Sequence, residues 1–418
     1  MQKPELFDSK KSFLTTVLVL GLIIVIRLYF EYFAYDAWIK KPFYFTQAKV
    51  LHAYVKTKNK KSYTVLKLRS DEGLTFYTTS HKKENFTDKN IRIEIFPNKD
   101  ISFFEYLGTF YVKSRIRKSE ELPSPLKDTL LQRVAMQHND VWMKSFYKAI
   151  FFATPIEKSL REKISLLGVS HLVALSGFHL AILWGLLYGS LMLLYRPMQQ
   201  KLFPYRHALL DVGLFTIVLL GVYLWFVDFP PSLLRSYAMM FLGWMVLLMG
   251  VELLSFTFLT TVILLLVVLF PALLVSLSFW FSVAGVFYIF LILHYVKAYN
   301  KWLVSLLFIP IGIFLLMLPI VHTVFTMTST YQLLSPLLSL LFMPFYPLVM
   351  LLHLLGFGSA LDEVLLWLFH LPKEGVSSLV PWWLLVIYLS LSLVSIWYKK
   401  FFYILLGVAS FYSLYLFV

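Results

Sequence analysis

Basic side chains are distributed very unevenly along this sequence of 418 residues. Residues 166–418 hold only nine of the 38 lysines and arginines, and apolar runs of membrane-crossing length fill most of that region. A helix needs about 20 mostly apolar residues to cross the hydrocarbon core of a bilayer. Hydrophobic residues make up 59% of the chain, well above the share typical of soluble domains. The sequence therefore predicts a polytopic α-helical membrane protein whose net charge of +15 belongs mainly to its first 165 residues.

The apolar runs give an expected topology. The first span lies within residues 1–39, and the lysines that precede it place the N-terminus in the cytoplasm. Further spans are predicted at residues 167–195, 208–228, 232–250, 253–273, 277–296, 302–322, 380–397 and 400–417. Prolines interrupt another apolar run, so residues 331–355 are predicted to form a re-entrant pair of half-helices. Residues 167–418 are thus expected to form a transmembrane domain of about 8–10 spans.

Residues 40–120 carry a different pattern, in which short runs are rich in β-branched and aromatic residues. Five strands are predicted, at Phe45–Lys56, Ser62–Arg69, Leu74–Thr79, Ile91–Phe96 and Leu107–Lys118. Several of these runs alternate polar and apolar residues with period two, as strands with one buried face do. They suit a small extracytoplasmic β-barrel of the OB type, inserted after the first span. Residues 121–166 are predicted to form an amphipathic helical linker.

Several classes of function are excluded by what the sequence lacks. There is no cysteine, so neither disulfides nor thiolate metal sites can form. No GxxxxGK[ST] motif is present, which excludes a recognisable P-loop ATPase, and no HxHxD cluster marks a binuclear metal site. We therefore expect a protein that is not an enzyme and that has no catalytic residues, metal or cofactor. Nothing resembles a cleavable signal peptide, so the first span is expected to be retained.

The segment Gly168–Leu183 places two histidines and two serines in an apolar run of membrane length. Polar groups at membrane depth are costly and often mark a transport path, and a Ser-Gly pair weakens the helix there. The candidates for a polar lining are His171, Ser176, Gly177 and His179. The open alternative is that the two histidines hydrogen-bond to neighbouring helices. A serine hydrolase is disfavoured, because neither a GxSxG motif nor a carboxylate is present in this span.

A second segment, Asp228–Ser236, contains two prolines that start a helix and an arginine about one turn into it. The guanidinium of Arg235 can contact a phosphodiester, because its planar fork matches phosphate geometry and it stays charged. The alternatives are an arginine that reaches the outer interface or pairs with Asp228.

A third segment, Ser276–Gly285, alternates serines with large side chains. Its candidates for lining a path are Ser278, Phe279, Trp280 and Phe281. Aromatic rings on a channel wall can stack on bases. The alternative is a seam of small residues where membrane helices pack.

Isolated polar side chains near the ends of predicted spans are assigned to the membrane interface. They are Asp211, Glu252, His294, His322 and His353.

The three segments occur in an order that resembles the ComEC family of competence proteins, the inner-membrane DNA-uptake channels of natural transformation. His171–Leu180 is similar to the family's HLLAISGLHV segment, Pro230–Ser236 to its SPSVLRA element and Leu277–Gly285 to its FQLSFLAVLG element. An OB-like domain after a first span is also part of the family plan. Longer members carry a C-terminal metallo-β-lactamase-like domain. This sequence ends in a predicted span at Val418, so the resemblance implies a short form with transport but no nuclease activity.

The resemblance implies a channel in the bacterial inner membrane that passes single-stranded DNA from periplasm to cytoplasm. The implied partners are single-stranded DNA, membrane lipids, a periplasmic DNA-binding receptor, and a cytoplasmic helicase or single-strand-binding protein that supplies the energy. Two alternatives remain open: a transporter for another polyanionic or lipid-linked substrate, and a membrane assembly scaffold.

The predicted outer domain also offers candidates for DNA binding, since OB-type barrels combine a basic groove with aromatic platforms. The candidate platforms are Tyr54, Tyr63, Phe76 and Tyr77. The candidate backbone contacts are Lys56, Lys58, Lys60, Lys61, Lys67 and Arg69.

Overall fold

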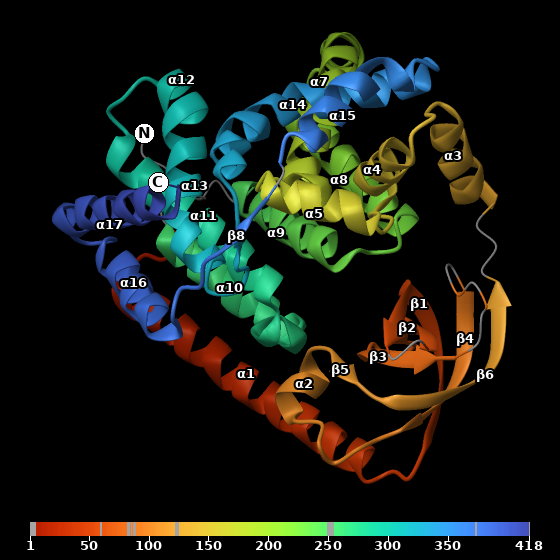
Figure 1. Cartoon of the computed structure of the whole chain (residues 1–418). Helices are drawn as coiled ribbons and strands as arrows, with labels where there is room; N and C mark the ends of the chain where they lie inside the picture. Colours follow the sequence, from red (N-terminus) through yellow and green to blue (C-terminus); the bar gives the residue numbers. More distant parts are fainter. Residues whose placement is uncertain are drawn as a thin grey trace. The chain divides into compact units, whose positions relative to one another are not determined.

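The computed structural model describes residues 6–58, 61–81, 84, 86, 89–121, 125–248, 255–372 and 374–417 (Figure 1). The chain divides into two compact units. The first, here called the β unit, comprises Phe7–Leu126 and Thr260–Phe279. The second, here called the membrane unit, comprises Lys127–Leu259 and Trp280–Val418 together with the first six residues.

The β unit begins with one long helix. Helix α1 (Lys10–Ile39) has 30 residues, which corresponds to about 45 Å at 1.5 Å per residue. The hydrocarbon core of a bilayer is only about 30 Å thick, so one end of the helix extends beyond it. The last turns pack into the sheet domain: Trp38 is buried, and the hydroxyl of Tyr35 donates a hydrogen bond to the carbonyl of Ile101 at 2.6 Å. The sheet domain is thereby fixed to the end of α1.

Six strands form one sheet in the β unit, in the spatial order β5-β3-β2-β1-β4-β6. They are β1 (Tyr44–Lys58), β2 (Lys61–Ser70), β3 (Thr75–Ser80), β4 (Lys89–Phe96), β5 (Phe110–Tyr111) and β6 (Lys113–Glu121). The first four predicted strands are confirmed, with ends that differ by only a few residues. All pairs are antiparallel except β3 with β5.

The fifth predicted strand, Leu107–Lys118, is wrong at its start. Helix α2 (Phe103–Leu107) occupies that position, because Ser102 and Glu105 form a capping box that starts a helix. Hydrogen bonds from the Ser102 backbone and side chain lower the pKa of the Glu105 carboxyl. The strand begins only after this helix and divides at Val112, whose N–H donates to the carbonyl of Tyr77 at 2.9 Å.

Apolar side chains fill the inner face of the sheet. Fully buried members include Leu66, Leu68, Phe76, Ile91 and Ile93. The period-two pattern of β2 and β4 directs these residues to one side, as a strand with one buried face requires. Trp38 joins the same cluster from α1.

The membrane unit is helical. After α3 (Pro125–Met136), the helices wholly within this unit are α4 (Val141–Phe152), α5 (Lys158–Leu166), α6 (Ser170–Val173), α7 (Gly177–Leu202), α8 (Ala208–Phe226), α9 (Pro231–Leu248), α12 (Lys301–Leu303), α13 (Ile309–Val321), α14 (Ser335–Leu354), α15 (Asp362–His370), α16 (Trp382–Val394) and α17 (Lys399–Phe417). Two further helices, α10 (Phe256–Leu269) and α11 (Leu277–Val296), are divided between the two units, at Leu259 and Phe279. A π-helical turn, Val304–Phe308, joins α12 to α13. In the described part of the chain, seven helices, α1 among them, are long and apolar enough to cross a membrane, and three shorter ones are apolar.

Two predicted membrane segments are wrong. The predicted pair of half-helices at 331–355 is a single helix, α14, that continues through Pro344 and Pro347. A proline removes one backbone hydrogen bond but does not have to end a helix where neighbouring structure supports it. The predicted span at 167–195 is instead divided, because the chain leaves the helical path between α6 and α7.

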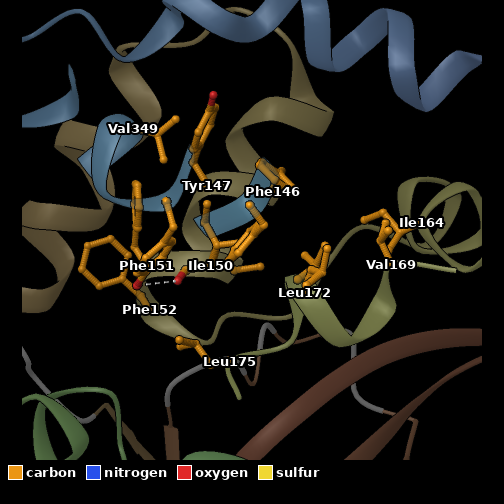
Figure 2. Close-up of a cluster of buried hydrophobic side chains, with 14 of the residues drawn as sticks. Phe146, Tyr147, Ile150, Phe151, Phe152, Ile164, Val169, Leu172, Leu175 and Val349 are labelled. Carbon is orange, nitrogen blue, oxygen red and sulfur yellow. Dashed lines mark hydrogen bonds between the residues drawn. The ribbon is translucent and has the colours of Figure 1, made fainter. Parts of the chain in front are cut away.

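The core of the membrane unit gathers around α4. Its buried residues include Phe146 and Ile150, and Figure 2 shows Leu172 and Leu175 beside them. The hydroxyl of Tyr223 on α8 donates to the carbonyl of Phe151 at 2.9 Å. Helix α4 thus ties α6, α8 and the turn that follows α6 into one packed body.

We predict that Phe76→Ala lowers the free energy of unfolding of the β unit by about 3–5 kcal/mol, because it leaves a cavity in a fully packed core. The exposed Phe104 on α2 supplies a matched control, for which the expected change is below about 1 kcal/mol. Protease resistance of the full-length protein, followed as urea is raised, measures both. Equal effects of the two substitutions would contradict the assigned core.

Candidate functional site

The break between α6 and α7 is held by the start of α9. Residues 174–176 lie outside both helices, so the carbonyl of the buried Leu175 has no partner within a helix. The hydroxyl of Ser232 donates a hydrogen bond to this oxygen at 2.6 Å. The first and second motifs of the sequence therefore meet at a backbone group that must be satisfied inside the protein.

Gly177 begins α7 at a point of close approach to α9. A Cβ atom at Gly177 would lie 2.8 Å from the side-chain oxygen of Ser236 and 3.2 Å from its Cβ. That oxygen is itself fixed, because it donates to the carbonyl of Ser232 at 2.9 Å. Glycine at this position allows the two helices to touch.

His179 is completely buried at the first turn of α7. The backbone N–H of Ser176 donates to its Nδ1 at 3.3 Å, which makes Nδ1 an acceptor. A neutral ring then carries its hydrogen on Nε2. Nε2 has no hydrogen-bond partner among the described residues, and the ring lies edge-on to Phe342 and Tyr346 of α14. A buried donor without a partner is uncommon and can mark a functional position.

His171 also faces α14, although it belongs to a different helix from His179. Its Nε2 lies 3.3 Å from the hydroxyl oxygen of Ser339. One turn earlier on α14, the hydroxyl of Ser335 donates to the carbonyl of Gly168 at 3.1 Å. Gly168 adopts φ +69°, a left-handed conformation that favours glycine. Both histidines thus lie against one helix, which agrees with the expected shared environment and also with the open alternative of histidines bonded to neighbouring helices.

Arg235 lies one turn into α9, three residues after Ser232, so the two residues project from similar sides of the helix. The turn before this helix is unusual, because Asp228 (φ +67°) and Phe229 (φ +52°) both adopt left-handed backbone conformations. Such conformations cost free energy in residues other than glycine and often cluster at functional sites. Lys127 forms an ion pair with Asp228 at 2.5 Å and helps to hold this turn.

A cavity of about 710 Å³ begins at the meeting point of the two motifs. Gly177 and Ser236 lie at its wall, and the rest of the lining comes from α7, α8 and α9. The rings of Trp184 and Tyr188 on this wall stack at 5.8 Å with an interplanar angle of 9°. Sequence reasoning missed these aromatic residues. Their signal is a stripe of small and aromatic residues on one face of α7, at positions 177, 181, 184 and 188.

On α11, some side chains of the third motif are buried and others are exposed. Phe279 is completely buried, so its ring cannot offer a free face, and its proposed role in stacking on DNA is wrong. Ser278 and Trp280 are exposed, and the ring of Phe281 packs against Phe325 at 5.9 Å. The structure thus leaves Trp280 as the exposed aromatic candidate of this motif.

The outer face of the β unit brings basic and aromatic side chains together across three strands. Residue pairing places Lys67 beside His52 on β1 and beside Tyr77 on β3. The Nζ atom of Lys67 lies 5.7 Å from the centre of the Tyr77 ring, and burial lowers the pKa of this lysine. The same register pairs Lys56 with Tyr63 and places Tyr54 opposite Val65, whereas Arg69 lies exposed at the end of β2. We call this surface the outer basic face.

Four other candidates of the β unit are not placed on the outer basic face. Phe76 points to the opposite side, where it is fully buried and stacks on Phe110 at 5.8 Å, so its prediction as a DNA platform is wrong. Lys60 lies outside the described residues. Lys58 and Lys61 belong to the paired ends of β1 and β2, and only their backbone is described.

A buried polar cluster joins three distant parts of the membrane unit and was missed by sequence reasoning. His138 Nδ1 lies 2.9 Å from a carboxylate oxygen of Asp362, and His138 Nε2 lies 2.9 Å from His353 Nε2. Tyr147 stacks on His138 at 4.4 Å. His353 and His322 lie at the ends of α14 and α13, as predicted for span ends, but their side chains are buried within the protein. Contacts between residues more than 200 positions apart leave no local sequence signal.

The hydrogen-bond partners limit how hydrogens can be arranged in this cluster. His353 Nδ1 lies 2.6 Å from the carbonyl of Val349, which can only accept, so this nitrogen carries a hydrogen and a neutral His353 accepts at Nε2. His138 must then donate to His353 from Nε2. Because a carboxylate also only accepts, His138 carries hydrogens on both nitrogens when Asp362 is ionised. The contacts therefore form a continuous buried chain from Asp362 through His138 to His353 and on to the backbone of Val349.

We predict that Gly177→Ala destabilises the membrane unit by about 1–3 kcal/mol, as overpacking at a close helix contact does. Gly185→Ala on the same helix is the matched control, because a Cβ there meets nothing within 4 Å. Thermal unfolding in detergent compares the two variants. Adding Ser236→Ala to Gly177→Ala should recover part of the loss, and an equal stability of the two alanine variants would contradict the assigned contact.

We predict that Asp362→Asn destabilises the same unit by about 1–3 kcal/mol, because it removes the carboxylate that contacts the buried His138 ring. Glu363→Gln removes a neighbouring exposed carboxylate from the same helical turn and should have little effect. The same thermal measurement applies. A stability change that is no larger for Asp362→Asn than for Glu363→Gln would show that the contact between Asp362 and His138 does not stabilise the unit.

Comparison with known proteins adds the last observation. The family model described as "Competence protein" matches residues 153–415, a range that includes all three motifs and the junction of α6, α7 and α9. No curated protein and no solved structure matches the chain. The match covers more than half of the sequence and agrees with the resemblance carried by His171–Leu180. The chain therefore belongs to the competence protein family, of the ComEC type, and is a multi-pass membrane protein with a role in competence.

Proposed function

We propose that this protein is a channel in the bacterial inner membrane that takes up single-stranded DNA from the periplasm into the cytoplasm during natural transformation. The observation that carries the proposal is the family match over residues 153–415, which contain the packed junction of the first two motifs. The N-terminus is cytoplasmic in this proposal, and the sheet domain lies on the periplasmic side. A periplasmic DNA-binding receptor delivers the strand, and a cytoplasmic helicase or single-strand-binding protein pulls it.

In this proposal the DNA path in the membrane unit follows the cavity between α7, α8 and α9. The stacked pair Trp184 and Tyr188 offers aromatic faces to bases, which gives binding without sequence preference. Arg235 contacts the phosphodiester backbone near the start of α9, where the strained turn at Asp228 fixes the helix entry. His171 and His179 hold the wall formed with α14, and no catalytic role is assigned to them.

The sheet of the β unit is proposed to close as a barrel of the OB type. Two observations support closure. Strands β5 and β6 are separated only by Val112, yet β5 forms one edge of the sheet, beside β3, and β6 forms the other edge, beside β4. The side chains of Thr78 and Ser114 also approach to 2.6 Å between β3 and β6. The outer basic face is then the surface that collects single-stranded DNA, through phosphate contacts and stacking on tyrosine rings.

One observation favours a second candidate function. The lining of the cavity is mostly apolar, which suits a lipid-linked substrate better than a bare polyanion. Cells that lack this protein and still bring DNA into the cytoplasm at the normal rate would favour that alternative. Loss of transformation, with DNA still bound outside the cytoplasm, supports the channel.

We predict that Lys67→Ala and Arg69→Ala each weaken the binding of a single-stranded oligonucleotide by the full-length protein and lower its salt dependence. Each lost phosphate contact should reduce the slope of log affinity against log salt by about 0.7. Lys99→Ala, in the loop after β4, removes the same charge away from the outer basic face and is the control. Binding that does not change with salt would contradict the electrostatic account.

We predict that Arg235→Ala reduces DNA uptake by about 10- to 100-fold, the effect of losing a hydrogen bond to a charged group of about 1.5–3 kcal/mol. The exposed Arg196 at the end of α7 provides a matched arginine, and its replacement by alanine should leave uptake unchanged. Transformation frequency is compared at equal protein levels in the membrane. Normal uptake by Arg235→Ala would exclude a phosphate contact at this position.

A further inference from the structure

A second cavity of the membrane unit carries cationic groups that the proposed DNA path does not use. It measures about 560 Å³ and lies between the end of α11, the start of α12 and the start of α10. Its polar lining includes His294, Lys297, Lys301 and Ser255. Phe256 and Phe290 form part of an apolar wall, with ring centres 6.3 Å apart. The cavity therefore has both a cationic and an apolar portion.

Among the described residues, no carboxylate forms a salt bridge with the two lysines of this cavity. Lys297 and Lys301 are the only lysines or arginines between Arg235 and Lys373, and no aspartate or glutamate occurs from residue 253 to residue 361. Two cations four residues apart thus share one cavity, which favours an anionic ligand.

The surroundings identify the ligand as an amphiphile. Beside the cavity, Trp302, Leu303 and Leu306 are exposed on a helical run of membrane-crossing length. Exposed apolar side chains on such a helix are normally covered by lipid chains. The lining residues Val304 and Ser305 also belong to the π-helical turn, and such turns occur often at functional sites. In a ligand with an anionic head group and acyl chains, the head group pairs with the lysines and the chains cover this apolar surface.

We propose that this cavity is a binding site for one anionic phospholipid, with the phosphate held by Lys297 and Lys301 and the acyl chains lying along α12 and α13. Basic pockets at the ends of membrane helices bind anionic lipid head groups in this way. The bound lipid fixes the end of α11 against the start of α12. This site is independent of the proposed DNA path, so its test does not depend on DNA uptake.

The test is native mass spectrometry of the full-length protein in detergent, titrated with dioleoyl phosphatidylglycerol or with dioleoyl phosphatidylcholine. The double variant Lys297→Gln/Lys301→Gln removes the proposed phosphate contacts. Lys399→Gln/Lys400→Gln, a lysine pair at the start of α17, is the control with the same charge loss. The expected result is one tightly retained phosphatidylglycerol, bound about 10- to 30-fold more weakly by the first variant only. Equal melting temperatures of the three proteins confirm that the variants are folded.

Four outcomes would overturn the proposal. Equal loss in both double variants would indicate a general charge effect on surrounding lipid, as would equal retention of the two lipids. Displacement of the lipid by inorganic phosphate or by a short single-stranded oligonucleotide would show a general phosphate site. Higher retention in Glu252→Gln would show that the chain supplies its own carboxylate, since Glu252 is the nearest one in sequence and lies outside the described residues.

Discussion

The carbonyl oxygen of Leu175 is the group on which the arrangement of the membrane unit depends. The chain leaves the helical path between α6 and α7, and a buried carbonyl without a partner is costly in a protein surrounded by lipid. Ser232 satisfies it, so α9 must begin beside this break. Gly177 then permits the contact with Ser236, and the cavity opens just beyond the two residues. One hydrogen bond and one missing side chain therefore place two separated motifs at a common site.

In the β unit, the two faces of the sheet carry different kinds of side chain. Its apolar side chains occupy one face of the sheet, and this leaves lysines, an arginine and tyrosines together on the other face. The buried end of α1 fixes this sheet domain to a membrane-crossing helix. A surface of this kind attracts polyanions through space and holds them by stacking at short range.

Much of the fold follows from local sequence patterns. Apolar runs located most membrane helices, and period-two alternation located the first four strands. Most of the errors have a common cause, which is that contacts with residues distant in the sequence determine the structure. The start of the fifth predicted strand is an exception, because the local capping box of Ser102 and Glu105 forms a helix there. Phe76 and Phe279 were expected to offer free rings, but packing buries them. Helix α14 continues through its prolines, and the cluster of His138, His353 and Asp362 forms across more than 200 residues. At the candidate site, the sequence motifs predicted residues of the junction between α6, α7 and α9. The aromatic wall at Trp184 was identified only from the packing of the helices in the structure.

The central claim is that DNA passes along the cavity next to the junction of α7 and α9. The chain has no cysteine, so a single introduced cysteine can carry a photocrosslinker without background. Ala181 lines the cavity, and Leu193 lies on the same helix with 80% of its surface exposed. The account predicts that a DNA strand caught during uptake crosslinks to Ala181→Cys and not to Leu193→Cys. Crosslinking at position 193 alone, or at neither position while uptake proceeds, would contradict it.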